Sequence, residues 1–576
     1  MTSMAARRAP ASKDADGALD ELRAQLRIAG PTIVSMLLYK LPWLFSLKFA
    51  GALGSEALAS AALATTICNV TGMSFAVGLS FGLTTLTGQA RGDLLRRGRA
   101  AGVGEEESCG GSHITDRIRR AADGAVTTSS GRTRRQGCEV EEEKKETDPL
   151  LGDPSSSLAG ESDNGVELIQ PLVFLFRGLA VQLLLVVPIG IWWICGTKST
   201  LLALGQGERL SGMTETYLRI LTPGLWSFSV CYTLTTWLQT IDMADVPAYA
   251  AFVGFALHVP TNVLFVRVLG LGIDGVALAT VVFQVIQPVL MLVYLFGTAR
   301  GRRRVLESTG ASAVGIVDLG ARRELVASLS MDGARNYLVL ALPGVVVISE
   351  WWASEVSIFL AGELQPDPDY GLGGMSIYQS INTFCFMFPI GFSAACSARV
   401  GLFLGLNDAG KAKQASRVGM LGALVLSMTM GGIIYLTPRR FFPSLFTSDD
   451  HVIESAGATM PFLAVYVLAD GMQTCLNAIL KGCGMQHAAM PVVIVAYWMV
   501  GVPLAYYLAF YRSHGTTDCD RAPLCGTAGL VAGMTVGTWS HFVLLLAVTL
   551  STVDWKNEAQ KAQERIALEK SKIELE

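Results

Sequence analysis

The sequence predicts an all-α integral membrane protein with about twelve transmembrane helices arranged as two halves of six. Hydrophobic residues make up 51% of the 576 residues and charged residues only 16%, whereas soluble domains carry about 25% charged residues. Apolar stretches long enough to cross a bilayer recur along the chain, and the second half repeats features of the first. These three observations indicate a polytopic membrane protein.

Each predicted helix is a stretch of about 20 mostly apolar residues, the length that spans a bilayer. Such stretches occur near residues 28–50, 60–86, 171–195, 216–238, 247–268, 273–297, 337–362, 373–398, 417–436, 455–479, 489–511 and 526–550. Several contain Pro or Gly, which membrane helices tolerate when neighbouring groups satisfy the freed backbone.

Matching motifs in the two halves indicate an internal repeat. An offset of about 312 residues relates Pro31 to Pro343, Gly78-Leu79-Ser80 to Gly391-Phe392-Ser393, and Gly88 to Gly401. Further along, an offset near 240 relates Pro223 to Pro461 and Pro260 to Pro503. The difference of about 70 is the length of a polar insert, residues 94–166, found only in the first half. Because six is an even number, the halves are expected to be parallel repeats about an axis along the membrane normal.

Basic residues in the loops predict the topology, because Lys and Arg concentrate on the cytosolic side. They gather after the second, sixth and eighth spans and in the N-terminal segment, so both termini are expected to be cytosolic. The expected organisation is a cytosolic tail 1–27, first-lobe helices 28–93, the insert 94–166, first-lobe helices 167–297, a cytosolic linker 298–335, second-lobe helices 336–550, and a cytosolic tail 551–576.

The insert is rich in Gly, Ser, Arg and Glu and is expected to be disordered. It contains Glu146 followed by Leu150 and Leu151, a pattern that resembles an acidic dileucine sorting signal for vacuolar or endolysosomal membranes. The plasma membrane is the alternative location. In the tail, Asp554–Glu576 alternates charges with Leu and Ile at helical spacing, which favours a solvated helix over a partner-binding element.

The eleven cysteines show no Cys/His spacing typical of a metal site, so no cofactor is expected. Cys519 and Cys525 lie in a predicted non-cytosolic loop, where an oxidising lumen would permit a disulfide or leave them free.

The segment Glu350-Trp-Trp-Ala-Ser-Glu355 places two carboxylates and two indoles in an apolar span. Ionisable residues within a bilayer are costly and usually mark a pathway. Five residues apart on a helix, the two carboxylates point about 140° apart. One is expected to line a cleft while the other faces into the second lobe, a division that suits proton exchange. The alternative is that one or both only bond neighbouring helices, and which of them titrates stays open.

Other intramembrane polar residues are weaker candidates. Trp351 and Trp352 would stack on a flat cation or pack against lipid at the membrane interface. About 100° apart on the helix, they cannot both line the cleft well. Asp470 is a third acid that would join a proton relay with Glu355 or form a structural hydrogen bond. Further candidate lining residues are Gln379, Asn382, Tyr497 and Asn69. The first span carries Lys40 and Lys48, and Lys40 would snorkel or pair with an acid across the cleft.

The chain resembles the multidrug and toxin extrusion (MATE) family of the eukaryotic type over about 480 residues. The resemblance rests on motifs that occur in order along both halves, among them Phe49-Ala-Gly-Ala-Leu-Gly54, Gln89-Ala-Arg-Gly92, Glu350-Trp351-Trp352, Pro389-Ile-Gly391, Lys481-Gly-Cys-Gly484 and Gly501-Val-Pro503. It implies two six-helix lobes arranged as a V and export of organic cations or plant-type organic solutes in exchange for protons or sodium. Two positions depart from relatives: Ser380 stands where many animal relatives have Glu, and the first span lacks the Asp of bacterial relatives.

The expected function is therefore secondary active antiport of a small organic solute, with a cationic solute expected and protons as the coupling ion. Sodium coupling and a lipid-linked precursor flippase are the alternatives within the same class of transporter. A receptor or scaffold is the alternative from a different functional class. An enzyme is not expected, because no nucleophile–base or metal constellation occurs. The expected partners are the solute, the ion and the bilayer, without nucleic acid, for a monomeric protein.

Overall fold

The computed structural model describes residues 10–108, 168–366, 368–516 and 524–575. The chain divides into a large unit, Met1–Gly98 with Leu168–Glu576, and a small unit, Arg99–Glu167. The large unit contains all the predicted spans. Among the described residues the elements are helical, with one isolated backbone bridge between Gln365 and Thr516 and no named strand, so the all-α prediction is confirmed.

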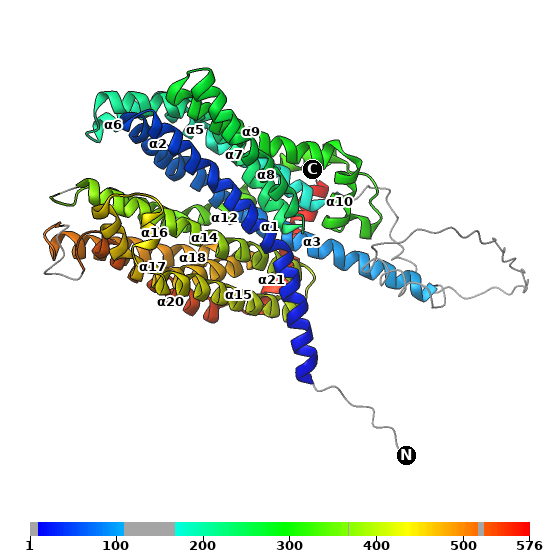
Figure 1. Cartoon of the computed structure of the whole chain (residues 1–576). Helices are drawn as coiled ribbons and strands as arrows, with labels where there is room; N and C mark the ends of the chain where they lie inside the picture. Colours follow the sequence, from blue (N-terminus) through cyan, green and yellow to red (C-terminus); the bar gives the residue numbers. More distant parts are fainter. Residues whose placement is uncertain (1–9, 109–167, 367, 517–523, 576) are drawn as a thin grey trace, which may run out of the picture. The chain divides into compact units, whose positions relative to one another are not determined.

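The large unit contains two groups of helices, which we call the first and second lobes (Figure 1). The first lobe consists of α1 Pro10–Ala52, α2 Ser55–Ile67, η1 Cys68–Met73, α3 Ser74–Ser108, α5 Gln170–Cys195, α6 Thr197–Ala203, α7 Glu208–Thr240, α8 Asp245–Asn262, η2 Val263–Val268, α9 Gly272–Leu292 and η3 Val293–Gly297. A linker follows with α10 Ala299–Thr309, η4 Ala311–Val314 and α11 Ala321–Ser328.

The second lobe consists of α12 Met331–Val347, α13 Ser349–Ala361, α14 Pro368–Gly405, α15 Ala409–Leu436, α16 Phe441–Ser444, α17 Asp450–Cys483, α18 Gln486–Val493, η5 Ile494–Gly501, α19 Val502–Tyr506, η6 Tyr507–Tyr511 and α20 Gly526–Thr552. The final helix is α21 Trp555–Leu575. The predicted span 337–362 is interrupted at Ile348, between α12 and α13, which places Glu350 in the first turn of α13.

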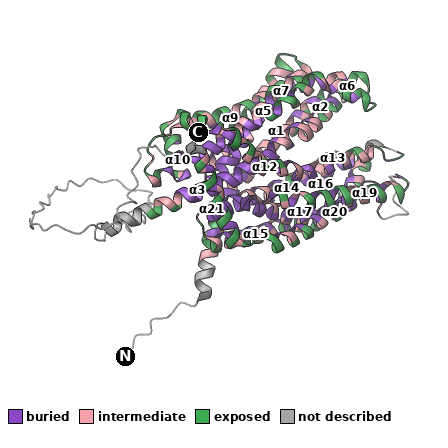
Figure 2. Cartoon of the chain, turned by 180° about the vertical axis from the view of Figure 1, so that it is seen from behind, coloured by how far each residue is buried: buried purple, intermediate pink, exposed green. Residues whose placement is uncertain are grey.

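Eleven helical segments in the described part of the chain are long and apolar enough to cross a membrane. Large apolar side chains, such as Leu184, Val293 and Leu436, are exposed, as expected of surfaces that contact lipid. Exposed residues lie along the outer faces of the helices (Figure 2). The remaining predicted span, 216–238, is helix α7, which carries many Ser and Thr. Its side chains are mostly buried against neighbouring helices, so it need not be apolar to lie within the bilayer.

The lobes meet along α3 and α14 through residues that the repeat relates. A Cβ atom on Gly88 would lie 3.3 Å from Gly401 Cα, so two equivalent glycines touch each other. A Cβ on Gly78 would lie 2.5 Å from Val345 Cα, and a Cβ on its counterpart Gly391 would lie 3.1 Å from the Ile33 nitrogen. Residues related by a two-fold axis contact one another only on that axis. The repeat predicted from spacing is therefore a pseudo-two-fold arrangement, with glycines where the backbones approach.

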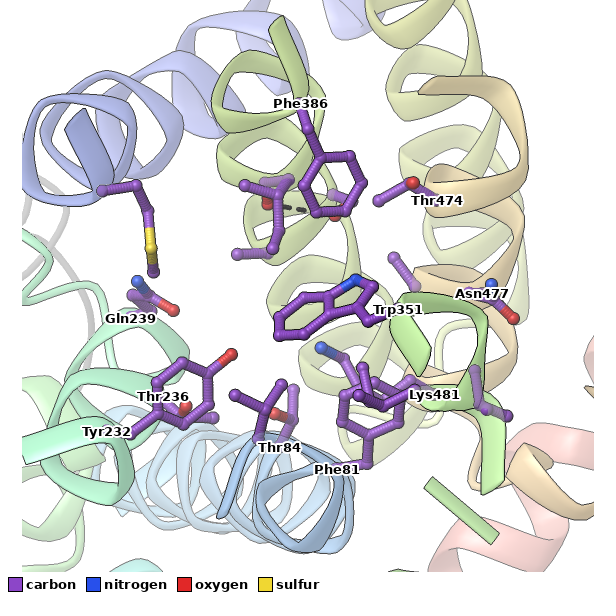
Figure 3. Close-up of a pocket in the computed structure, with 18 of the residues that line it drawn as sticks. Phe81, Thr84, Tyr232, Thr236, Gln239, Trp351, Phe386, Thr474, Asn477 and Lys481 are labelled. Atoms are coloured by element: carbon purple, nitrogen blue, oxygen red, sulfur yellow. Dashed lines mark hydrogen bonds between the residues drawn. The ribbon is translucent and has the colours of Figure 1, made fainter. Parts of the chain in front are cut away.

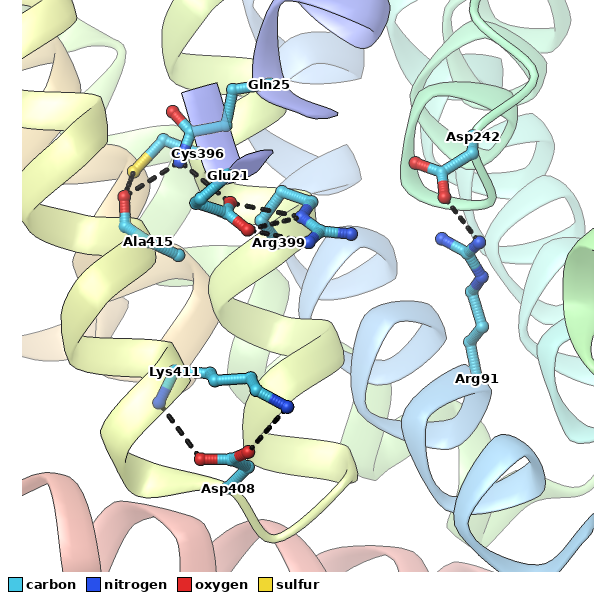
Figure 4. A network of polar contacts seen from close by, with 9 residues as sticks. All are labelled: Glu21, Gln25, Arg91, Asp242, Cys396, Arg399, Asp408, Lys411 and Ala415. Carbon is cyan, nitrogen blue, oxygen red and sulfur yellow. Dashed lines mark hydrogen bonds and ion pairs between the residues drawn. The ribbon is translucent and has the colours of Figure 1, made fainter. Parts of the chain in front are cut away.

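Polar contacts hold the lobes together around these glycines, and we call this region the closed end. Thr85 Oγ1 donates to the Lys481 carbonyl over 2.5 Å, and Gln89 Nε2 donates to the Gly482 carbonyl over 3.2 Å. The start of α1 also reaches the second lobe, where Glu21 pairs with Arg399 over 2.6 Å (Figure 4). Arg399 of α14 thus braces this helix against α1.

Helix α21 corrects the expectation of a solvated C-terminal helix. Ala559, Ala562 and Ile566 are buried on one face of it, and Glu569 is buried at 3% exposure. Glu569 Oε2 pairs with Arg177 of the first lobe over 2.7 Å, while Gln563 Nε2 donates to the Gly405 carbonyl of the second lobe over 2.8 Å. The charges that suggest a solvated helix in the sequence are partly used as contacts across the closed end.

The start of the polar insert also differs from expectation. Helix α3 continues to Ser108, so residues 94–108 are helical instead of disordered. The rest of the predicted insert, including Glu146, Leu150 and Leu151, lies outside the described residues, as does Cys519. Cys525 forms a disulfide bond.

Candidate functional site

A cavity of about 70 Å³ lies between the lobes, next to the closed end (Figure 3). Its walls come from α1, α3 and α7 of the first lobe and from α12, α13, α14 and α17 of the second. Organic ligands occupy pockets of about 300–1,000 Å³. The space has room for a few water molecules, so a solute would enter only after the lobes separate here.

The repeat explains the position of the cavity. Helix α7 is followed by a left-handed residue, Asp242, and α17 by left-handed Gly484, which sets an offset of 242 residues between these helices. With this offset and the earlier one, twelve lining residues form six equivalent pairs: Met36 and Ile348, Val77 and Ile390, Phe81 and Ala394, Tyr232 and Thr474, Thr236 and Ala478, Gln239 and Lys481. The cavity therefore lies on the pseudo-two-fold axis.

The two halves of the cavity differ in chemistry although their backbones are related. Aromatic rings come from both lobes: Phe81 and Tyr232 from the first, Trp351 and Phe386 from the second. Figure 3 shows Lys481 and Trp351 pointing into the space opposite Tyr232 and Gln239. The Lys481 ammonium lies 4.8 Å from the centre of the Phe81 ring.

Several polar atoms of the lining have no hydrogen-bond partner among the residues that the structure describes. They are Thr84 Oγ1, Gln239 Nε2 and Asn477 Oδ1, each shielded from solvent by its surroundings. Buried polar atoms are normally paired, so unpaired ones in a cavity wall are groups available to a ligand or to water.

Glu350 connects this cavity to a buried polar network inside the second lobe. Its side chain is 10% exposed, and its Oε2 accepts a hydrogen bond from Gln473 Nε2 over 3.3 Å. The same amide nitrogen lies 2.9 Å from Asp470 Oδ1 and 3.2 Å from the Tyr497 hydroxyl. Glu350 Oε2 and Asp470 Oδ1 are thus no more than about 6 Å apart, with the Gln473 amide nitrogen between them.

His541 of α20 closes the network from the other side. Its Nδ1 lies 3.5 Å from Glu350 Oε2, and its ring meets the Tyr497 ring edge-on at 5.4 Å between centres. The Tyr497 hydroxyl is also 3.1 Å from Thr538 Oγ1. Neither ring nitrogen of His541, which is fully buried, has a hydrogen bond within the described part of the chain. The network thus joins residues of α13, α17, η5 and α20.

Glu355 lies outside both the cavity lining and this network. It is partly exposed and interacts electrostatically with Lys40 of α1, which places the two opposite charges of the two lobes within electrostatic range of each other. The two glutamates do lie in different surroundings, but not as predicted: Glu350 both lines the cavity and joins the network inside the second lobe, while Glu355 interacts with the first lobe. Asp470, however, lies beside Glu350 instead of Glu355.

The remaining predicted residues are dispersed. Trp351 lines the cavity, whereas Trp352 donates from Nε1 to Ser74 Oγ over 3.1 Å, so the two indoles face different surroundings as expected. Gln379, Asn382 and Asn69 are absent from the lining of the described cavity.

Sequence reasoning did not select four residues that the structure brings to the site: Gln239, Gln473, Lys481 and His541. Lys481 enters the sequence analysis only as part of a family motif. A signal for His541 was available, because an ionisable residue within the span 526–550 is by itself a functional candidate.

Comparison with known proteins gives a consistent result. The MatE family profile matches residues 31–94, 173–264 and 344–507, more than half of the chain. The chain is 26% identical to protein DETOXIFICATION 12 of Arabidopsis thaliana over 557 residues, covering 95% of this chain and 92% of that protein. It is 28% identical to DETOXIFICATION 49 of the same plant over 401 residues, covering 68% and 73%. Its fold is similar to the crystal structure of the eukaryotic MATE transporter AtDTX14, with a TM-score of 0.72 and 22% identity over 96% of this chain and 100% of that one.

Proposed function

Because this chain belongs to the MatE family of multidrug and toxin extrusion transporters, we propose that it exports small organic solutes in exchange for protons, using carboxylates of the second lobe. The protein is a multi-pass membrane transporter and not an enzyme. The observation that carries the proposal is the pair Glu350 and Asp470, joined by the Gln473 amide directly behind the cavity.

Two carboxylates this close in a buried setting repel each other, and one proton on either of them relieves that repulsion. Protonation also changes which groups Gln473 and His541 can bond, because a protonated carboxyl donates as well as accepts. Trp351, the next residue on α13, lines the cavity. A proton at Glu350 therefore acts on the helix that forms a cavity wall, which supports exchange by coupling the proton site to the solute site.

Proton coupling fits the donors of this network better than sodium coupling. Hard cations prefer a cage of oxygen ligands. Here an amide nitrogen lies between the two carboxylates, and an imidazole nitrogen faces Glu350. Sodium exchange stays the second candidate, since the carboxylate, amide and hydroxyl oxygens of these residues would be the ligands.

The test is uptake of a fluorescent organic solute into proteoliposomes with an imposed pH gradient. Glu350→Gln and Asp470→Asn are expected to abolish the gradient-driven component, while Glu363→Gln, an exposed acid just after α13, is expected to leave it unchanged. Glu355→Gln is expected to keep the dependence on the gradient because Glu355 lies outside the network. Uptake that ignores the pH gradient and follows sodium instead would refute proton coupling.

The orientation follows from the loop charges. We propose that the closed end, with both α21 and the start of α1, faces the cytosol, because the arginines after the second and sixth spans lie on that side of the predicted topology. The vacuolar or endolysosomal membrane is the proposed location, resting on the dileucine pattern. Unchanged localisation after replacement of Leu150 and Leu151 by Ala would exclude this signal.

A further inference from the structure

The charge available to a solute in the cavity is positive. Glu350 and Lys481 are the charged residues of the described lining. Glu350 Oε2 is engaged by Gln473 and faces His541 inside the second lobe. The Lys481 ammonium contacts the face of Phe81 and has no carboxylate or hydrogen-bond acceptor among the described residues. An aromatic face attracts an ammonium more weakly than an anion does once water is excluded.

The position of Lys481 explains why this charge is not cancelled by symmetry. Its equivalent in the first lobe is Gln239, which lines the opposite wall with an unpaired Nε2 donor. The two equivalent positions therefore present an ammonium and an amide N–H to the same space. Both are donors, and a solute that satisfies both must offer acceptor oxygens.

The other residues of the cavity lining indicate the shape of the solute that would fit. Trp351, Phe386 and Tyr232 supply aromatic surface, and Trp351 meets the Phe386 ring edge-on at 6.4 Å between centres. Thr84 Oγ1, without a partner in the described part of the chain, is a further polar group on the same helix as Phe81. This combination fits a flat aromatic ring better than a small inorganic anion, which would gain nothing from the rings.

We propose that Lys481 selects the charge of the solute, and that the cavity takes an aromatic solute with an acidic group, such as a carboxylate, in preference to an organic cation. This inference rests on the proposed transport function and reverses the cationic solute expected from Glu350 and Glu355. A cation would meet the Lys481 ammonium in a water-poor space, where like charges repel strongly. The proton need not be opposite in charge to the solute, because it binds at the Glu350–Asp470 pair and acts through the position of α13.

The test separates binding from transport by using one ring system with two charges, 9-anthracenecarboxylate and 9-anthracenemethylammonium. Binding to the purified protein is measured by quenching of tryptophan fluorescence, without any gradient. Wild type is expected to bind the carboxylate at least tenfold more tightly than the ammonium. Lys481→Gln is expected to lose most of this preference and Lys481→Arg to keep it, while acetate, which carries the charge without the ring, is expected not to compete.

Matched variants keep the test decisive. Lys411→Gln removes the same charge from the surface, where Lys411 pairs with Asp408, and is expected to change nothing. Gln239→Glu adds a negative charge opposite Lys481 and is expected to shift the preference toward the ammonium. The Lys481 backbone carbonyl, which accepts from Thr85, is retained in every variant. Equal binding of both probes, or a preference that Lys481→Gln leaves intact, would overturn the inference even if proton-driven uptake is found. Conversely, carboxylate binding without pH-driven uptake would leave the inference standing and overturn the proposed function.

Discussion

Replacement of Glu569 by Ala is expected to release helix α21 from the closed end. Arg177 and Glu569 are 2% and 3% exposed, and Arg177 Nη1 lies 2.7 Å from Glu569 Oε2. The other carboxylate oxygen accepts from Asn336 Nδ2 over 2.7 Å, so both oxygens are paired. Removing one partner of a buried ion pair costs about 3–5 kcal/mol, because the other charge stays buried without compensation.

This free-energy cost can be measured as a faster rate of amide hydrogen exchange in α21. Each 1.4 kcal/mol is a factor of ten in an equilibrium constant, so the amides of α21 are expected to lose about two to three and a half orders of magnitude of hydrogen-exchange protection. Mass spectrometry on the protein in nanodiscs measures this for peptides that cover Trp555–Leu575. The amides of α17, in the centre of the second lobe, serve as an internal reference.

Two further variants show whether the ion pair is responsible. Glu564→Ala removes an exposed carboxylate of the same helix, which among the described residues accepts a hydrogen bond only from Gln560, and is expected to change protection little. Glu569→Leu combined with Arg177→Met removes both charges, and is expected to recover most of the loss since no buried charge is left unpaired. Equal protection in Glu569→Ala and Glu564→Ala would refute the claim that this pair holds the helix.

Two other substitutions test the cavity and the contact between the lobes. Trp351→Ala removes part of the cavity wall and is expected to weaken binding of an aromatic solute about tenfold, because stacking contributes about 1–2 kcal/mol. Trp352→Ala is expected to leave solute affinity unchanged, because the Trp352 indole contacts Ser74. Competition binding measures both affinities. Gly401→Val forces a side chain toward Gly88 and is expected to open the closed end, seen as faster labelling of a cysteine placed at Thr85. Unaltered labelling would show that the glycine contact is dispensable.

The fold was largely predictable because its signals are local. Apolar length indicates each helix, and the paired glycines and prolines indicate the repeat without any knowledge of contacts. Gly88 and Gly401 were recognised as equivalent, although their direct contact depends on how two helices cross. The docking of α21 was not predictable in this way, because Glu569 and Glu564 look alike in the sequence and differ only in what surrounds them.

The sequence identified single residues of the candidate site, but not which residues contact one another there. Glu350 is identifiable because a carboxylate in an apolar span is costly. Its neighbour Asp470 comes from a helix more than a hundred residues away, and the rotation of α17 against α13 decides that it lies beside Glu350 and not Glu355. Lys481 lies at the end of its predicted span, where a lysine usually reaches toward solvent, so its position in the cavity appears only when the two lobes are assembled.

The repeat also shows which chemistry is confined to one lobe. With the same offsets, the first-lobe equivalents of Glu350, Asp470 and Gln473 are Leu38, Phe228 and Cys231, none of which carries an ionisable carboxyl or an amide. The backbones are related closely enough to place Gly88 against Gly401 and Gln239 across from Lys481. A symmetric framework permits the lobes to move as two similar bodies about one axis. Because the Glu350–Asp470 pair lies in the second lobe, the proton binding proposed above would change the packing of that lobe and leave the first as the reference against which it moves.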